Sequence, residues 1–202
     1  MPLEIELKLA FPEEALPLIL RHPLIAAAPR VGEPGVLDNT YFDTPALALK
    51  ANRIALRLRK QGTETLQTVK SAAESLGGLT QRAEWEQPWR GQFDFSAIDD
   101  PKAAALLERL RDDLVPVFNT HFNRDIRRFQ PREGACILIM IDTGVVTADA
   151  RTAVISEVEL ELAAGETTDL HRLADTLQKD LPLVPEDVSK AERGYGLLPL
   201  RR

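Results

Sequence analysis

The sequence predicts an α+β fold in which a largely antiparallel β-sheet is covered by amphipathic helices. Two observations support this prediction. Most of the chain shows the two-residue alternation of apolar and polar side chains that is typical of β-strands, and short turns join these segments. Other segments space their apolar residues as a helix does, as in Leu106, Leu107 and Leu110. The spacing of the strands favours an antiparallel meander or a barrel.

The strand pattern begins near the start of the chain and returns throughout it. Leu3–Leu9 alternates strictly between apolar and charged residues. Further strands are expected over Val36–Phe42, Arg53–Lys60, Thr65–Lys70, Thr80–Pro88, Val117–Phe129, Ala135–Asp142, Val145–Ala148 and Ala153–Leu162. No loop between them is long enough to indicate a domain boundary, so we expect a single domain over residues 1–202.

Helical spacing predicts three helices and one shorter helical segment. The segment after Asp100-Pro101 begins as helices commonly do, and another ends directly before Pro182. The expected helices span Glu13–Arg21, Lys102–Leu114 and Asp169–Leu181, and a short helical turn is expected over Ser189–Gly194.

The composition is that of an ordinary globular domain and excludes several classes of function. The 202 residues are 44% hydrophobic and 28% charged, which is enough to bury a core. With 25 Lys and Arg against 31 Asp and Glu, the net charge of -6 argues against nucleic acid or an anionic membrane as a partner. The single cysteine, Cys136, excludes an internal disulfide and a cysteine-based zinc site.

The chain also shows no targeting or membrane-spanning segment. No apolar run approaches the roughly 20 residues that a membrane span needs. The opening MPLEIELK is charged from its fourth residue and lacks the apolar core of a signal peptide. We therefore expect no membrane partner and a cytoplasmic location.

Four predicted strands carry their charged residues on one face. Successive side chains of a strand point to opposite faces, so residues two apart lie together. The charged faces hold Glu4, Glu6 and Lys8; Arg57 and Arg59; Arg82, Glu84 and Glu86; and Glu157, Glu159 and Glu161. Neighbouring carboxylates repel each other, so such clusters usually persist because a cation lies between them.

Two arrangements of the sheet fit this pattern. In the first, the apolar face covers a core and the charged face lies in water. In the second, the sheet closes into a barrel, with its apolar face outward under the helices and its charged face lining the interior. The residues alone leave both arrangements open.

A charged interior of this kind would suit a metal complex of a polyphosphate. Carboxylates bind hard divalent cations such as Mg²⁺ or Mn²⁺, which in turn bridge to phosphate oxygens. Arginine pairs with phosphate through two hydrogen bonds, and lysine supplies a mobile positive charge. A carboxylate-bound metal also lowers the pKa of a water molecule and positions it for attack.

The order of the charged motifs resembles that of the CYTH superfamily, the triphosphate tunnel metalloenzymes. The resemblance runs from Glu4 to Tyr195, nearly the whole chain. The matching segments are Glu4-Ile-Glu-Leu-Lys8 (ExExK), Asn39–Thr44, Leu56-Arg-Leu-Arg59 (LRxR), Lys70, Arg82-Ala-Glu-Trp-Glu86 (RxExE), Arg124, Asp142, Glu157-Val-Glu-Leu-Glu161 (ExExE) and Ser189–Tyr195 (SKxxRGY). It implies one CYTH domain over residues 1–202, with the C-terminal CHAD domain of many relatives absent or removed. It also implies an antiparallel eight-stranded barrel with amphipathic helices packed outside, which favours the second arrangement.

The resemblance also implies a role for each charged residue. Metal ligands would be Glu4, Glu6, Asp142, Glu159 and Glu161, which would bind Mg²⁺ or Mn²⁺. Triphosphate would be held by Lys8, Arg57, Arg59, Lys70, Arg82, Arg124 and Lys190. Catalysis would depend on Glu6, Lys8, Asp142 and Lys190, while Glu84 and Glu86 would orient the basic residues. Glu157 is expected to lie too far along the tunnel to reach a metal, and Tyr195 is expected to anchor the last helix.

Within the superfamily, the chain most resembles the bacterial inorganic triphosphatases. This implies a metal-dependent hydrolase that converts tripolyphosphate to pyrophosphate and phosphate. A nucleotide enzyme of the same family, either an adenylate cyclase or a nucleoside or thiamine triphosphatase, is the alternative. A non-catalytic polyphosphate-binding module is a further alternative. The expected partner is thus a small molecule that contains a triphosphate, with polyphosphate as a second candidate; the sequence does not specify an oligomeric state.

Overall fold

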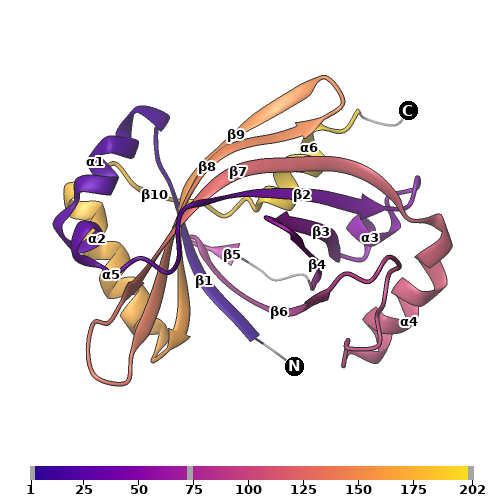
Figure 1. Ribbon diagram of the computed structural model, residues 1–202, viewed down its shortest axis with the longest axis horizontal. Helices are drawn as coiled ribbons and strands as arrows, with labels where there is room; N and C mark the ends of the chain where they lie inside the picture. Colours follow the sequence, from indigo (N-terminus) through magenta and orange to yellow (C-terminus); the bar gives the residue numbers. More distant parts are fainter. Residues whose placement is uncertain (1–2, 72–74, 200–202) are drawn as a thin grey trace.

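The computed structural model describes residues 3–71 and 75–199, and its centre is a closed antiparallel barrel (Figure 1). In these two described ranges, ten strands form one sheet, and pairing of β1 with β6 closes eight of them in the order β1-β9-β8-β7-β2-β3-β4-β6. The barrel strands are β1 (Leu3–Ala10), β2 (Gly35–Asp43), β3 (Ala55–Gln61), β4 (Glu64–Lys70), β6 (Leu79–Pro88), β7 (Val115–Phe129), β8 (Cys136–Ala148) and β9 (Arg151–Ala164). Two short strands, β5 (Ser75–Leu76) and β10 (Val184–Pro185), extend the sheet beside β6 and β1.

Strand β8 corrects one prediction, because Ala135–Asp142 and Val145–Ala148 belong to one continuous strand rather than two. Thr143 and Gly144 stay paired with both neighbouring strands. Glycine is required here for close packing, since a Cβ on Gly144 would lie 2.2 Å from the carbonyl oxygen of His121.

Within the described residues, six helices lie around the barrel, and all of the predicted helices are present. They are α1 (Leu16–Arg21), α2 (Pro23–Ala27), α3 (Ala48–Ala51), α4 (Pro101–Leu110), α5 (Thr167–Asp180) and α6 (Lys190–Leu197), with 3₁₀ turns over Glu13–Ala15 and Arg111–Asp113. The sequence did not indicate α2 and α3, because each is too short to show helical periodicity. Helix α6 extends further than the predicted turn over Ser189–Gly194.

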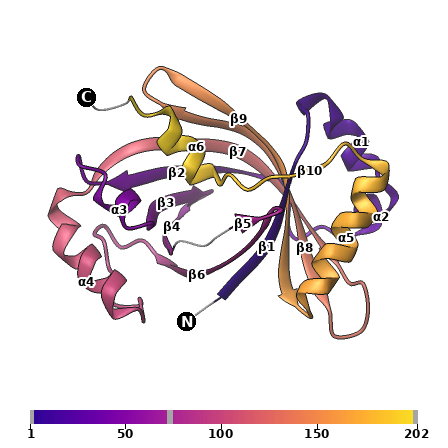
Figure 2. The same ribbon diagram turned by 180° about the vertical axis from the view of Figure 1, so that it is seen from behind.

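Helices lie against the outer face of the barrel (Figures 1 and 2). Apolar clusters fill the space between these helices and the strands. Helices α1, α2 and α5 cover β1, β8 and β9, where Ile19 and Leu173 pack with Leu160. Helix α4 covers the other side, where Leu107 packs with Trp85 of β6. The apolar strand faces thus point outward and the charged faces point inward, as in the second arrangement. In the described part of the chain, no helix is both long enough and apolar enough to span a membrane.

Candidate active site inside the barrel

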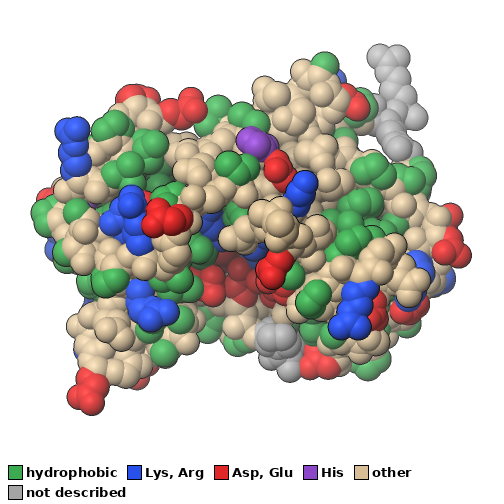
Figure 3. All heavy atoms as spheres, viewed as in Figure 1, with side chains coloured by type: hydrophobic (Ala, Val, Ile, Leu, Met, Phe, Trp, Pro, Cys, Tyr) green, Lys and Arg blue, Asp and Glu red, His purple; other side chains and the backbone are tan. Residues whose placement is uncertain are grey.

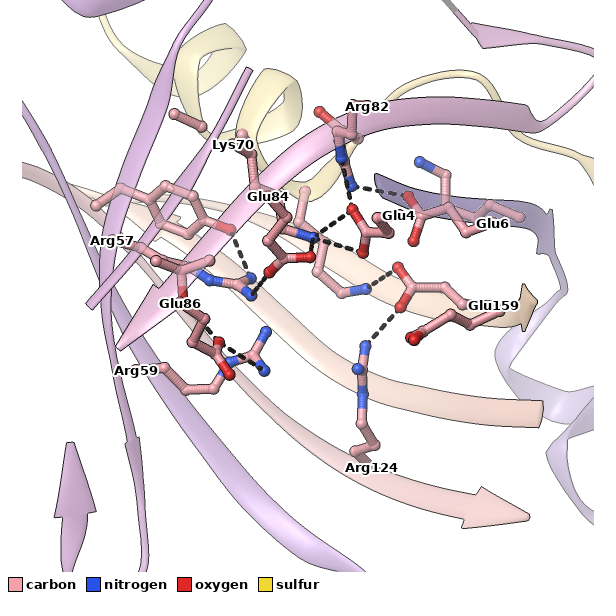
Figure 4. Close-up of a pocket in the computed structure, with 18 residues that line it drawn as sticks. Glu4, Glu6, Arg57, Arg59, Lys70, Arg82, Glu84, Glu86, Arg124 and Glu159 are labelled. Atoms are coloured by element: carbon pink, nitrogen blue, oxygen red, sulfur yellow. Dashed lines mark hydrogen bonds and ion pairs between the residues drawn. The ribbon is translucent and has the colours of Figure 1, made fainter. Parts of the chain in front are cut away.

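The charged faces of the strands enclose a cavity of about 230 Å³ inside the barrel (Figure 4). Acidic side chains are visible within a hollow on one face of the molecule (Figure 3). The cavity is lined by nearly all the residues that the sequence singled out: Glu4, Glu6, Lys8, Arg57, Arg59, Lys70, Arg82, Glu84, Glu86, Arg124, Glu159, Glu161 and Lys190. Asp142 is the exception, because it is fully buried in the wall behind the cavity.

Strand register brings these charges together. In the β1–β6 ladder, Glu4 lies opposite Arg82, and in the β4–β6 ladder, Lys70 lies opposite Glu84. Lys8 of β1 lies opposite Glu159 of β9. Each of these pairs places opposite charges on neighbouring strands, which stabilises the sheet and fixes the side chains that face the cavity.

The first group of ion pairs lies where β1, β4 and β6 meet (Figure 4). Lys70 Nζ donates to both carboxylate oxygens of Glu4, at 2.8 and 2.9 Å. Arg82 donates from Nε to Glu4 and from Nη2 to Glu6, both at 2.8 Å. Burial alone would raise the pKa of Glu4, but the charges of Lys70 and Arg82 lower it to about 2. Glu4 is therefore a charged carboxylate at neutral pH.

Two other carboxylates of the same wall have raised pKa values. Burial and the nearby Glu159 raise the pKa of Glu6 to about 7. Burial, followed by the charges of Glu4 and Glu84, also raises the pKa of Glu161, which makes no ion pair within residues 3–71 and 75–199. A hard divalent cation prefers carboxylate oxygens and would relieve this repulsion. The donor set of this wall therefore fits Mg²⁺ or Mn²⁺.

A second group of ion pairs surrounds Lys190, the first residue of α6. Its Nζ lies 2.7 Å from Asp142 Oδ2 and 2.8 Å from Glu159 Oε1, and it also contacts Glu157. The oxygens of these three carboxylates lie within 4.8 Å of one another. By geometry they could hold a metal ion, but in this arrangement the Lys190 ammonium already contacts all three.

Two arginines complete this second group. Arg124 donates to Asp142 from Nε at 2.7 Å and to Glu159 from Nη2 at 2.5 Å. Arg193 Nη2 donates to Glu157, which is fully buried. The structure thus places Asp142 behind Arg124 and Lys190. Its role as a metal ligand stays a prediction, because its carboxylate is one of the three that could hold a metal ion by geometry.

A third group, of basic side chains, lies across the cavity on β3. Arg57 Nη2 is 3.8 Å from Glu84 and Arg59 Nη1 is 3.9 Å from Glu86. The Nε and Nη2 atoms of Arg57 are buried and find no hydrogen-bond acceptor in the described part of the chain. Burial and the positive charges of Arg57 and Arg124 lower the pKa of Arg59 to about 10. Unsatisfied donors and repelling cations both favour an anionic ligand such as phosphate.

Several residues of the site were not assigned a role from the sequence. The Tyr41 hydroxyl accepts a hydrogen bond from Arg57 Nη1 at 3.5 Å, and Thr68 donates to Glu86 at 2.9 Å. Both side chains line the cavity, where alternation along β2 and β4 places them. Arg193 lies one helical turn after Lys190, so their spacing could have indicated that both reach the same carboxylate.

The fold and the paired rows of acidic and basic side chains together define a class, the closed tunnel barrels with a charged interior. The chain belongs to the CYTH family, whose domain model matches residues 2–195. An inorganic triphosphatase of Haemophilus influenzae is 29% identical over 172 residues, which cover 80% of this chain and 46% of that protein. The chain thus spans about half the length of this relative.

Solved structures share the same fold. A candidate adenylyl cyclase from Hippeastrum, described as having a dominant triphosphatase activity, is 23% identical with a TM-score of 0.68 and 98% coverage of both chains. A candidate adenylate cyclase from Bacillus halodurans is 18% identical, with a TM-score of 0.60 and coverage of 96% of this chain and 98% of that one. The triphosphatase of a mimivirus capping enzyme is 12% identical, with a TM-score of 0.53 and coverage of 88% and 89%. At these identities the likeness concerns the fold.

Proposed function

We propose that the protein is an inorganic triphosphatase that uses a divalent metal to hydrolyse tripolyphosphate to pyrophosphate and phosphate. The main support is that one wall of the cavity would bind a cation and the opposite wall would bind an anion. Glu6 and Glu161 lie on a wall of carboxylates whose pKa values are raised, while Arg57 offers buried donors without acceptors. A metal–triphosphate complex would satisfy both walls at once. The triphosphatase from Haemophilus influenzae supports the same class of reaction.

Metal binding would fall to the carboxylates of β1 and β9. We propose Glu4, Glu6, Glu159 and Glu161 as the ligands of Mg²⁺ or Mn²⁺, because their side chains line the cavity. When bound, such a metal supplies a water of lowered pKa and neutralises phosphate oxygens. Asp142 lies behind these ligands, and its part would be to hold Arg124 and Lys190 in place.

Triphosphate binding would fall to the basic side chains around the cavity. Arg57 and Arg59 would receive the phosphate oxygens directly, and Lys8 makes no ion pair with any described residue. Lys70 and Arg82 both donate hydrogen bonds to Glu4. If Glu4 also bound a metal ion, some of these donors would be free to bind phosphate oxygens. The remaining basic groups are Arg124 and Lys190. Metal and triphosphate would therefore bind cooperatively.

A second cavity favours the alternative of an organic triphosphate. Its volume is about 420 Å³, and it shares Lys70 and Arg82 with the first cavity. Its wall includes Ile54 and Tyr195, which could contact a nucleoside or thiamine group. This observation supports a nucleoside or thiamine triphosphatase, or an adenylate cyclase, as the second candidate.

Phosphate release from four substrates separates these functions. The test compares tripolyphosphate, ATP, thiamine triphosphate and pyrophosphate, each with Mg²⁺, Mn²⁺ or EDTA. The proposal expects fast, metal-dependent release from tripolyphosphate and slow release from the others. Preferred turnover of ATP or thiamine triphosphate, or formation of cyclic AMP, would support the second candidate. Metal-independent binding without any turnover would indicate a polyphosphate-binding module.

A further inference from the structure

A buried carboxylate outside the cavity links helix α6 to the barrel. Asp43 ends strand β2 and is fully buried. Its Oδ1 accepts hydrogen bonds from the backbone N–H groups of Thr44 and Leu49, both at 2.7 Å. Its Oδ2 accepts from the backbone N–H of Lys50 at 2.9 Å and from the hydroxyl of Tyr195 at 2.9 Å. One side chain therefore joins the end of β2, the start of α3 and the helix α6.

The same end of α6 is held tightly by an aromatic ring of β7. A Cβ on Gly194 would lie 2.2 Å from the Phe118 ring, so the helix backbone rests directly on that ring. Tyr195 packs against Phe118 edge to face, with 5.0 Å between ring centroids. Lys50 Nζ lies 5.3 Å from the Tyr195 ring centroid. The position of Tyr195 is therefore fixed by Phe118 and Lys50 at its ring and by Asp43 at its hydroxyl.

The other end of α6 carries Lys190 into the cavity. The helix spans only Lys190–Leu197, and a reciprocal capping box between Ser189 and Glu192 stiffens its first turn. Because the helix is short and capped, a shift at Tyr195 would move Lys190 as well. The Lys190 ammonium in turn needs its present place to reach Asp142 and Glu159.

We infer that Asp43 is a positioning residue, which acts through Tyr195 to hold α6 so that Lys190 stays at the cavity wall among its carboxylates. The inference rests on the proposed function only for its catalytic consequence, since the placement of Lys190 is a structural property. The hydroxyl of Tyr195 is the link to test, because Tyr195→Phe removes one hydrogen bond and keeps the ring that packs on Phe118.

Lysine reactivity tests the placement directly. Each protein is treated with a limiting amount of an amine-acylating reagent, and mass spectrometry follows the labelling of individual lysines. Buried Lys190 should react at least about ten times more slowly than exposed Lys102 in the unmodified protein. We expect Tyr195→Phe and Asp43→Asn to speed labelling of Lys190 by roughly threefold or more without changing Lys8. An unchanged Lys190 rate in Tyr195→Phe would overturn the inference, whether or not Asp43→Asn folds.

Ile19→Val is the matched control for a general loss of stability. It removes one buried methyl group from the apolar cluster under α1 and touches neither α6 nor the cavity. Its Lys190 labelling should equal that of the unmodified protein. Equal acceleration in Ile19→Val and Tyr195→Phe would show that any mild destabilisation exposes Lys190, and would also overturn the inference.

A double-mutant cycle tests the catalytic consequence. Hydrolysis of tripolyphosphate is compared in the unmodified protein, Tyr195→Phe, Lys190→Ala and the double variant. If Tyr195 acts through Lys190, its substitution should lower kcat/KM by about fivefold alone but less than about twofold beside Lys190→Ala. Equal effects in both backgrounds would contradict positioning through Lys190. If the unmodified protein hydrolyses no triphosphate, the proposed function fails, while the labelling rates still decide the role of Asp43.

Discussion

Glu6 of β1 and Glu161 of β9 lie directly opposite each other in the barrel wall, and burial raises the pKa of both side chains. Two paired carboxylates on neighbouring strands are unfavourable unless a cation joins them. Their pairing is therefore one feature of the cavity that a bound metal ion would stabilise.

Removal of one of these carboxylates should abolish metal-induced stabilisation. Mg²⁺ or Mn²⁺ at about 100 times its dissociation constant should stabilise the unmodified protein by about 2.7 kcal/mol. Glu161→Gln should lose most of this gain. Without metal its melting temperature should not fall, because the substitution removes a charge that Glu4 and Glu84 repel. Thermal unfolding with metal or EDTA measures both effects, and exposed Glu33→Gln is the control. Full metal stabilisation of Glu161→Gln would contradict this assignment.

Loss of the Arg57 guanidinium should impair hydrolysis much more than folding. Its buried donors have no acceptors, so we expect them to bond with phosphate oxygens. A hydrogen bond to a charged group contributes about 1.5–3 kcal/mol, so Arg57→Ala should lower kcat/KM for tripolyphosphate by roughly 10- to 150-fold. Arg57→Lys keeps the charge but not the forked donors, and should show an intermediate loss. Arg128→Ala, an exposed residue of β7, is the control; equal losses in Arg57→Ala and Arg128→Ala would argue against phosphate binding by Arg57.

The buried Glu157 should matter mainly for stability. It contacts both Lys190 and Arg193, so Glu157→Ala would leave one buried and one half-buried cation with one partner fewer. Breaking a buried ion pair costs about 3–5 kcal/mol, and we expect a loss of that size in urea unfolding. Glu108→Ala breaks the exposed pair with Arg111 and should cost no more than about 1 kcal/mol. Similar losses of unfolding free energy in the two variants would show that the ion pairs of Glu157 contribute little to stability.

Two glycines of α6 provide a matched steric test. A Cβ on Gly194 would lie 2.2 Å from the ring of Phe118, whereas a Cβ on Gly196 would meet no atom within 4 Å. Gly194→Ala should therefore destabilise the protein by about 1–3 kcal/mol or more, and Gly196→Ala should leave stability unchanged or raise it by up to about 1 kcal/mol. Chemical denaturation measures both. Equal stability of the two variants would show that α6 does not rest on Phe118 as described.

Local pattern predicted the eight barrel strands, although it divided β8 in two, and it predicted the face on which their charges lie. It did not indicate the two-residue strands β5 and β10. Alternation along β1 and β9 correctly placed Glu4, Glu6, Glu159 and Glu161 on one surface. Closure of the barrel was not predictable from that pattern, because it depends on pairing of β1 with the distant β6. Only the resemblance to the CYTH superfamily favoured a closed barrel over an open sheet.

The sequence also did not predict how deeply each inward-facing side chain is buried. Asp142 and Glu161 both carry carboxylates on the inner face, yet Asp142 is fully buried while Glu161 lines the cavity. The difference comes from Arg124 and Lys190, which lie over Asp142 from β7 and α6. Strand periodicity specifies a face, but burial depends on which neighbours reach that face from other elements.

Because β1 pairs with β9, this part of the barrel can form only late in synthesis of the chain. Leu3–Ala10 leaves the ribosome long before Arg151–Ala164, its neighbour in the sheet. Until β9 emerges, one edge of β1 has no partner, and its backbone groups remain open to pairing with another chain. Such late, long-range closure is slow and leaves partly folded chains prone to aggregation. The alternating charges of β1 counter this hazard. Glu4, Glu6 and Lys8 line the cavity in the folded protein, and before β9 is made they keep the unpaired strand soluble.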